Sequence, residues 1–153
     1  MNYIVKELRK SDLSADKAGL DSFEDLLETY NNLSPTPKIP KQKVVKYFDK
    51  IKKQWTVIFV AVEKKSKKII WALTLLVEYK ILRWWSMAWH IEDVVVRKWY
   101  EWLWIWSALM QKSIEKAKKL WCYKIILDCD DDLSGYYCKF WFEDNGTFMR
   151  SYL

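Results

Sequence analysis

Glycine is scarce in this sequence of 153 residues, which contains three glycines and eleven tryptophans. A typical globular chain is about 7% glycine, so roughly 11 glycines are expected here. Several tryptophans stand where a glycine is expected, including Trp55 between a lysine-rich helix and a strand, and the pair Trp84-Trp85 between two strands. Trp121 ends a helical pattern, at the usual place of a C-cap glycine. The composition therefore indicates that tryptophan has replaced glycine.

The sequence also lacks the features of several protein classes. It has no apolar run of the roughly 18 residues that a membrane span requires, and charged and apolar side chains alternate over residues 1–10, so we expect no membrane helix and no secretory signal. The cysteines at positions 122, 129 and 138 form neither a CxxC pair nor an even disulfide set, which favours a cytoplasmic protein. The single histidine, His90, argues against a His-rich zinc site, and we expect no metal.

The hydrophobic and charged composition of the chain is sufficient for one folded domain. The chain is 51% hydrophobic and 30% charged, and no repeat or flexible linker divides it, so we expect one domain over residues 1–153. A helix at 104–120, with Leu109, Met110, Ile114 and Ala117 facing inward, separates two strands and predicts a parallel crossover. The predicted class is α/β (α+β), with a mixed central sheet flanked by helices. The other expected helices are 21–31, 41–53 and 135–140, and the expected strands are 3–8, 56–62, 68–79, 90–96, 124–129 and 147–153.

The segment 90–107, HIEDVVVRKWYEWLWIWS, carries the most information about chemistry. With glycine at each tryptophan it becomes a strand, then a glycine-rich turn, then a helix. Such a turn binds anions, because its backbone N–H groups point inward, the helix dipole favours negative charge, and missing side chains let a phosphate approach. The segment therefore predicts a phosphate-binding turn, whose space the indoles of Trp102, Trp104 and Trp106 would fill.

This turn resembles the acetyl-CoA pyrophosphate loop of the GNAT acetyltransferase superfamily, Q/R-x-x-G-x-G/A, with the match at residues 101–106. The segments HIEDVVV (90–96), CYKIILDCD (122–130) and YYCKFWF (136–142) narrow the resemblance to the glucosamine 6-phosphate N-acetyltransferases. That family implies a GNAT fold, usually a homodimer. It implies direct transfer of acetyl from acetyl-CoA to the amine of glucosamine 6-phosphate, an early step of UDP-N-acetylglucosamine synthesis.

The resemblance also implies roles for individual residues. Tyr137 would stabilise or protonate the leaving thiolate. Glu92, Asp93 (through its backbone carbonyl) and Asp130 would hold the sugar and its amine, with one carboxylate helping to remove a proton. Lys124 and Arg150 are the candidate partners of the sugar phosphate. The residues expected to contact acetyl-CoA are Val94, Val96, Glu101, Trp102, Leu103, Trp104, Ile105, Trp106, Ser107 and Ser134.

Other interpretations follow from the tryptophans and the charge. Because tryptophan occupies the loop positions, we expect weak or absent acetyl-CoA binding, or a non-catalytic or engineered Gly-to-Trp variant. A net charge of +6 with interleaved lysines and aromatics permits a single-strand nucleic-acid-binding module, and tryptophan beside lysine permits a membrane-surface protein. Anionic substrates explain the basic charge equally well, so we expect neither nucleic acid nor membrane as a partner.

Overall fold

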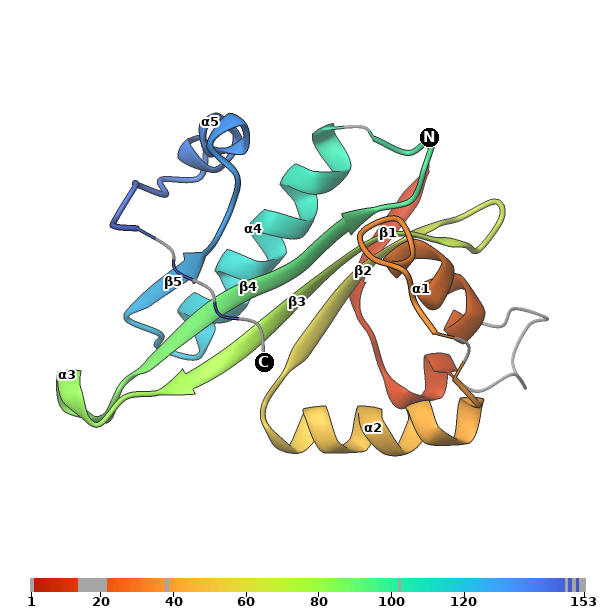
Figure 1. The fold of residues 1–153 in the computed structure, drawn as a ribbon, viewed down its shortest axis with the longest axis horizontal. Coiled ribbons are helices and arrows are strands. Elements are labelled where there is room, and N and C mark those ends of the chain that lie inside the picture. The colour runs from red at the N-terminus through yellow and green to blue at the C-terminus, as the bar shows by residue number, and fades with distance from the viewer. Residues whose placement is uncertain are drawn as a thin grey trace.

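The computed structural model describes residues 2–13, 22–37, 39–101, 103–147, 149 and 151 (Figure 1). Its centre is a sheet of five strands in the order β1-β2-β3-β4-β5. The first four strands are antiparallel to their neighbours, and β5 is parallel to β4. The sheet is therefore mixed, as predicted. The strands are β1 (Tyr3–Glu7), β2 (Val57–Glu63), β3 (Ile69–Tyr79), β4 (Met87–Val96) and β5 (Lys124–Leu127).

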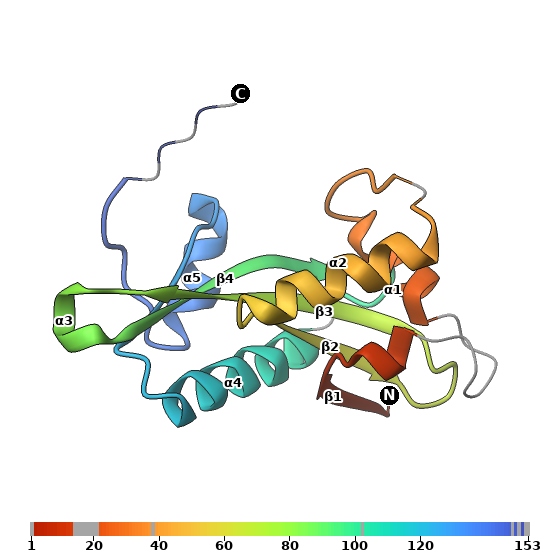
Figure 2. The ribbon, with the colours of Figure 1, turned by 90° about the horizontal axis from the view of Figure 1, so that it is seen from below.

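Helices cover both faces of this sheet (Figure 2). One face packs against α1 and α2, and the opposite face packs against α4, which connects β4 to β5 and confirms the predicted parallel crossover. The α-helices are α1 (Ser22–Tyr30), α2 (Lys41–Lys53), α3 (Leu82–Trp85), α4 (Leu103–Lys119) and α5 (Ser134–Cys138), with 3-10 turns η1 (Lys10–Leu13) and η2 (Asp131–Leu133). No helix in the described ranges is both long and apolar enough to cross a membrane.

The two-sided cover explains the uninterrupted apolar run of β2. Phe59 and Ala61 join the core beneath α4, whereas Ile58 and Val60 join the core beneath α1 and α2. A strand buried on both faces needs apolar residues at consecutive positions rather than at alternate ones. The run therefore reflects the three-layer architecture.

The structure corrects three expectations. Thr147, Met149 and Ser151, the described part of 147–153, do not lie in a strand. The strand β5 ends at Leu127, two residues before the predicted end, and it is only partly buried at the edge of the sheet among the described strands. On α4, Ser113 is fully buried in place of the half-buried Ile114, since its hydroxyl donates to Leu109 O at 2.9 Å and needs no water.

Candidate active site

The strands β4 and β5 part midway along β4. Their pairing ends at Ile91 with Leu127, although β4 continues to Val96. The register of β4 against β3 shifts at the same place, and Asp93 there adopts a φ of +50°. An extra residue of this kind is a β-bulge, which bends a strand and redirects its side chains. The segment from Val94 to Val96, of which Val95 is buried and the other two residues are half-buried, thus has no partner from β5 and leaves backbone groups for a ligand.

Three side chains meet where these strands part. His90 Nε2 lies 3.4 Å from a carboxylate oxygen of Glu92 and 3.2 Å from one of Asp128. Glu92 follows the last paired residue of β4, and Asp128 follows the last residue of β5. The group offers an imidazole and two carboxylates at one point, which suits recognition of an amine and removal of its proton. The ligand atoms of the three residues lie within 4.8 Å of one another, so they could also hold a divalent cation.

Asp128 is a residue that the sequence analysis did not select. Asp130, the predicted carboxylate, is exposed and precedes the turn η2, so the structure does not bring it to His90 as it does Asp128. The feature that identifies Asp128 is the parallel register of β5 against β4. Glu92 and Asp128 each follow the last paired residues of two parallel strands, Ile91 and Leu127, so the parallel register brings them side by side.

Asp93 has a different neighbour from Glu92. Its carboxylate acts on Tyr30 of α1, whose pKa is raised to about 12 by burial and further by that negative charge. The Tyr30 hydroxyl also lies 3.3 Å from the Thr74 hydroxyl of β3. The bulge therefore separates the two adjacent carboxylates, with Glu92 at the β5 side and Asp93 beside α1.

Tyr137 of α5 is buried, at 8% exposure, and packs on aromatic rings. The ring centroids of Trp106 and Phe142 lie 5.4 Å and 6.1 Å from its own. Burial raises the pKa of its phenol, and the Cys129 thiolate would raise it further when ionised, so the hydroxyl keeps its proton through the neutral range. Tyr137 therefore has the protonation state that a proton donor needs.

The indole of Trp106 fills the space between the start of α4 and α5. It is 7% exposed, and its ring lies 4.8 Å from Phe140, besides its contacts with Tyr137 and Tyr136. Trp104 is exposed and Ile105 is fully buried in the core. The first turn of α4 is thus crowded by aromatic side chains where the sequence predicts room for a phosphate.

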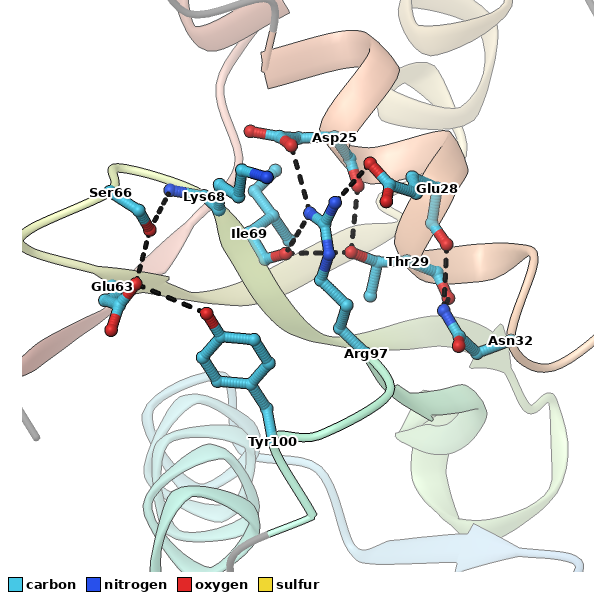
Figure 3. A network of polar contacts seen from close by, with 10 residues as sticks. All are labelled: Asp25, Glu28, Thr29, Asn32, Glu63, Ser66, Lys68, Ile69, Arg97 and Tyr100. Atoms are coloured by element: carbon cyan, nitrogen blue, oxygen red, sulfur yellow. Dashed lines mark hydrogen bonds and ion pairs between the residues drawn. The ribbon is translucent and has the colours of Figure 1, made fainter.

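Arg97 anchors the loop that leads from β4 into α4 (Figure 3). Its buried guanidinium pairs with Asp25 at 3.0 Å and with Glu28, both on α1, and donates to Ile69 O at 3.4 Å. Thr29 Oγ1 donates to the same carbonyl at 2.9 Å. The loop is therefore attached to α1 and β3 through one buried ion pair.

Three further contacts hold the loop downstream of Arg97. The Lys98 N–H donates to Asn32 Oδ1 at 3.2 Å. The Tyr100 hydroxyl donates to Glu63 at 3.4 Å (Figure 3). Trp71 Nε1 donates to Tyr100 O at 2.7 Å. These bonds fix the path of the backbone just before the first turn of α4.

Several predicted residues lie apart from this centre or outside the described residues. Trp102 and Arg150 belong to the parts that the structure does not describe. Lys124 is exposed at the start of β5, four residues and about 13 Å along the strand from Asp128. Ser134 begins α5, and its hydroxyl donates to Asp131 O at 2.8 Å. Glu101 is exposed and Ser107 is half-buried on α4.

Comparison with known proteins gives the family. No family model matches the chain. Glucosamine 6-phosphate N-acetyltransferase 1 of Dictyostelium discoideum is 38% identical over 122 residues, which cover 76% of this chain and 75% of that protein. The chain belongs to the glucosamine 6-phosphate N-acetyltransferase family. Glucosamine 6-phosphate N-acetyltransferase 1 of Oryza sativa subsp. japonica is 26% identical over 152 residues, or 98% of this chain and 87% of that protein.

Solved structures agree with this assignment. Glucosamine-6-phosphate N-acetyltransferase from Arabidopsis thaliana superposes with a TM-score of 0.87 at 25% identity, covering 99% of each chain. An acetyltransferase of Trypanosoma brucei gives a TM-score of 0.88 at 25% identity, covering 99% of this chain and all of that one. A GNAT family acetyltransferase of Staphylococcus aureus, 18% identical with a TM-score of 0.75, shares the fold. The predicted GNAT fold is confirmed.

Proposed function

We propose that the chain transfers the acetyl group of acetyl-CoA directly to the amine of glucosamine 6-phosphate, giving N-acetylglucosamine 6-phosphate and CoA. Family membership supports the reaction. The structural observation that carries the proposal is the meeting of Glu92 and Asp128 where β4 and β5 part, beside the unpaired end of β4. Carboxylates at that point lie beside the path of an extended ligand along β4.

The proposed reaction requires a proton acceptor and a proton donor, and residues of this site supply both. Glu92 or Asp128 accepts a proton from the sugar ammonium group, so that the neutral amine attacks the thioester carbon. The tetrahedral intermediate breaks its C–S bond and releases the CoA thiolate, and the second proton of the amine nitrogen returns to the Tyr137 phenolate once the thiolate is protonated, while the carboxylate releases the first proton to solvent. Tyr137 donates its phenolic proton to that thiolate, and its raised pKa keeps the proton available. Asp128 takes the place that the sequence analysis assigned to Asp130, because Asp128 lies beside His90 and Glu92.

Acetyl-CoA would lie along the open edge of β4. Backbone groups of Val94 and Val96 pair with the pantetheine arm as an added strand would. The first turn of α4 would hold the pyrophosphate through its backbone N–H groups, over residues 101–107. We further propose that the protein is a cytoplasmic homodimer, that it acts in UDP-N-acetylglucosamine synthesis, and that Lys124 and Arg150 are candidates for binding the sugar phosphate.

We also propose that the tryptophan-bearing chain is impaired. A glycine at position 106 would leave open the space next to Tyr137 that the indole now occupies. With tryptophan there, acetyl-CoA would have to displace a buried indole that packs on three aromatic rings. The expected result is weak or absent acetyl-CoA binding.

The test compares the chain with a version that carries glycine at the eleven tryptophan positions. Acetyl transfer to glucosamine 6-phosphate by the glycine version, lost in its Glu92→Gln variant, would support the proposed reaction. A folded glycine version that binds acetyl-CoA but transfers no acetyl group would overturn it. A saturable isotherm at micromolar acetyl-CoA on the tryptophan-bearing chain would overturn the impairment.

A further inference from the structure

Six tryptophans lie in left-handed backbone conformation. Their φ angles run from +58° to +74°, and in the described ranges only three other non-glycine residues, Lys67, Arg83 and Asp93, have positive φ. An L-residue is disfavoured there because its Cβ approaches the backbone, whereas glycine pays no such penalty. The six positions are Trp55, Trp84, Trp85, Trp99, Trp121 and Trp141.

Three of these tryptophans end helices in the same way. Thr56 N donates to Ile51 O at 3.1 Å after α2, Cys122 N to Ala117 O at 3.1 Å after α4, and Phe142 N to Tyr137 O at 3.4 Å after α5. Each bond spans five residues and encloses one left-handed tryptophan. This is the Schellman motif, in which the enclosed residue is usually glycine. The three ends thus have the hydrogen bonds of a glycine cap and a tryptophan in the glycine position.

The indoles bring little packing that would compensate at these positions. Trp84, Trp121 and Trp141 are 97%, 88% and 95% exposed, and all six left-handed tryptophans are more than half exposed. Trp89, which is not one of the six, is also poorly accommodated. It is fully buried, and its Nε1 has no hydrogen-bond acceptor. The positions therefore suit glycine through their backbone, and the side chain at Trp89 has an unmet hydrogen bond.

The uniformity of the replacement points to translation. Independent mutation of glycine codons would introduce several different residues, yet one residue recurs at eleven positions and only three glycines remain. UGA is a codon that some translation systems read as tryptophan and that differs from a glycine codon, GGA, by one base. We infer that the eleven tryptophan positions are UGA codons that the source cell decodes as glycine, so that the protein it makes carries glycine there. This inference rests on backbone geometry and composition, independently of the proposed reaction.

The test is peptide mass spectrometry on the protein isolated from its own cells, together with the codons of its gene. Trypsin releases residues 84–97, which hold three tryptophan positions, and residues 99–112, which hold four. We expect both peptides at the masses of their glycine forms and UGA at all eleven codons. The peptide 140–150 is an internal control, because it contains both Gly146 and the tested position Trp141.

Either measurement can overturn the inference without any assay of activity. A tryptophan-containing peptide at any of the six left-handed positions would refute it, as would UGG codons. A glycine-containing protein that proves inactive with glucosamine 6-phosphate would leave this inference standing and refute the proposed function instead.

Discussion

At the scale of single residues, backbone angle and side-chain identity disagree at the left-handed tryptophans. Each left-handed position costs a residue with a side chain roughly 1–2 kcal/mol relative to glycine. Trp121 isolates this cost best, because its side chain is in solvent and its N–H already donates to Lys118 O at 3.1 Å. A change at this position therefore affects the backbone and little else.

We expect Trp121→Gly to raise the ratio of folded to unfolded protein roughly 5- to 30-fold over Trp121→Ala, since both remove the indole and only glycine accepts the left-handed angle. Urea unfolding followed by circular dichroism measures the ratio. Trp104 is the matched control, because it is exposed within the helix α4, where alanine should be more stable than glycine by about 1 kcal/mol. Equal stability of the two variants at position 121 would refute the free-energy cost assigned to the left-handed angle.

Tyr137 is the second residue whose environment decides its chemistry. In the glycine version, Tyr137→Phe should lower kcat by at least about 100-fold, because the thiolate loses its proton donor, with little change in KM for the sugar. Steady-state assays of CoA release measure both constants. Tyr136→Phe is the control, since Tyr136 is the exposed neighbour on α5. Similar losses in the two variants would remove the proposed role of Tyr137.

At the scale of elements, the contacts of Arg97 join the loop before α4 to the helix α1. The two carboxylates that face the guanidinium differ, because the side chain of Asp25 is 13% exposed and that of Glu28 is 64% exposed. Loss of the buried partner leaves a buried charge poorly compensated, whereas loss of the exposed partner is screened by water.

We therefore expect Asp25→Asn to destabilise the glycine version by about 3 kcal/mol, and Glu28→Gln by less than about 1 kcal/mol. Denaturant unfolding gives both values. The loop should also become more mobile in Asp25→Asn, which faster hydrogen exchange at Lys98 and Tyr100 would report. An equal loss in both variants would show that the ion pair does not anchor the loop.

The strand β1 is joined to two helices by one carboxylate. Glu7 lies 2.7 Å from Lys52 of α2 and 3.5 Å from Lys116 of α4. Burial raises its pKa, but the two lysines together outweigh burial and hold the pKa below its ordinary value. A lowered folded-state pKa stabilises the fold above the unfolded-state value and loses that contribution as pH falls through the folded-state value.

Stability should thus decrease as pH falls below about 4, and part of this decrease should disappear in Glu7→Gln. Thermal unfolding between neutral and acidic pH measures the difference. Glu24→Gln, at an exposed position of α1, is the control and should keep the full dependence on pH. An unchanged acid dependence in Glu7→Gln would contradict the assigned pairs.

At the scale of the whole molecule, the strained tryptophans act together. Six left-handed positions at roughly 1–2 kcal/mol each sum to about 6–12 kcal/mol. The full stability of a domain of this kind is about 5–15 kcal/mol. The family fold is therefore compatible with the tryptophans only at a large loss of stability.

The glycine version should consequently unfold at a much higher denaturant midpoint than the tryptophan-bearing chain, with an unchanged or larger slope. Tryptophan fluorescence cannot compare the two chains, so far-ultraviolet circular dichroism is the appropriate measurement. A tryptophan-bearing chain that is as stable as the glycine version would contradict the summed cost. It would also indicate that the side chains pack in a way that offsets the strain.

Local pattern alone determined most of the elements of this protein. Periodicity predicted the helix α2 to the residue and the strands β2, β3 and β4 to within a few residues, because their apolar runs or faces are properties of consecutive side chains. The shortage of glycine predicted that tryptophans occupy turns, and the positive φ of Trp55 and Trp121 confirms it. Motif resemblance gave the fold and the family, which the comparisons confirm.

Tertiary structure alone decided which acidic side chains meet. The sequence offers Asp128, Asp130, Asp131 and Asp132 within five residues, and nothing local distinguishes them. The parallel register of β5 against β4 brings Asp128 beside His90, and the bulge at Asp93 turns that residue toward α1. Likewise, the ion pair of Arg97 with Asp25 joins residues 72 positions apart. Such contacts depend on how strands and helices pack against one another. That packing is set only when the whole chain folds, so local sequence does not predict it.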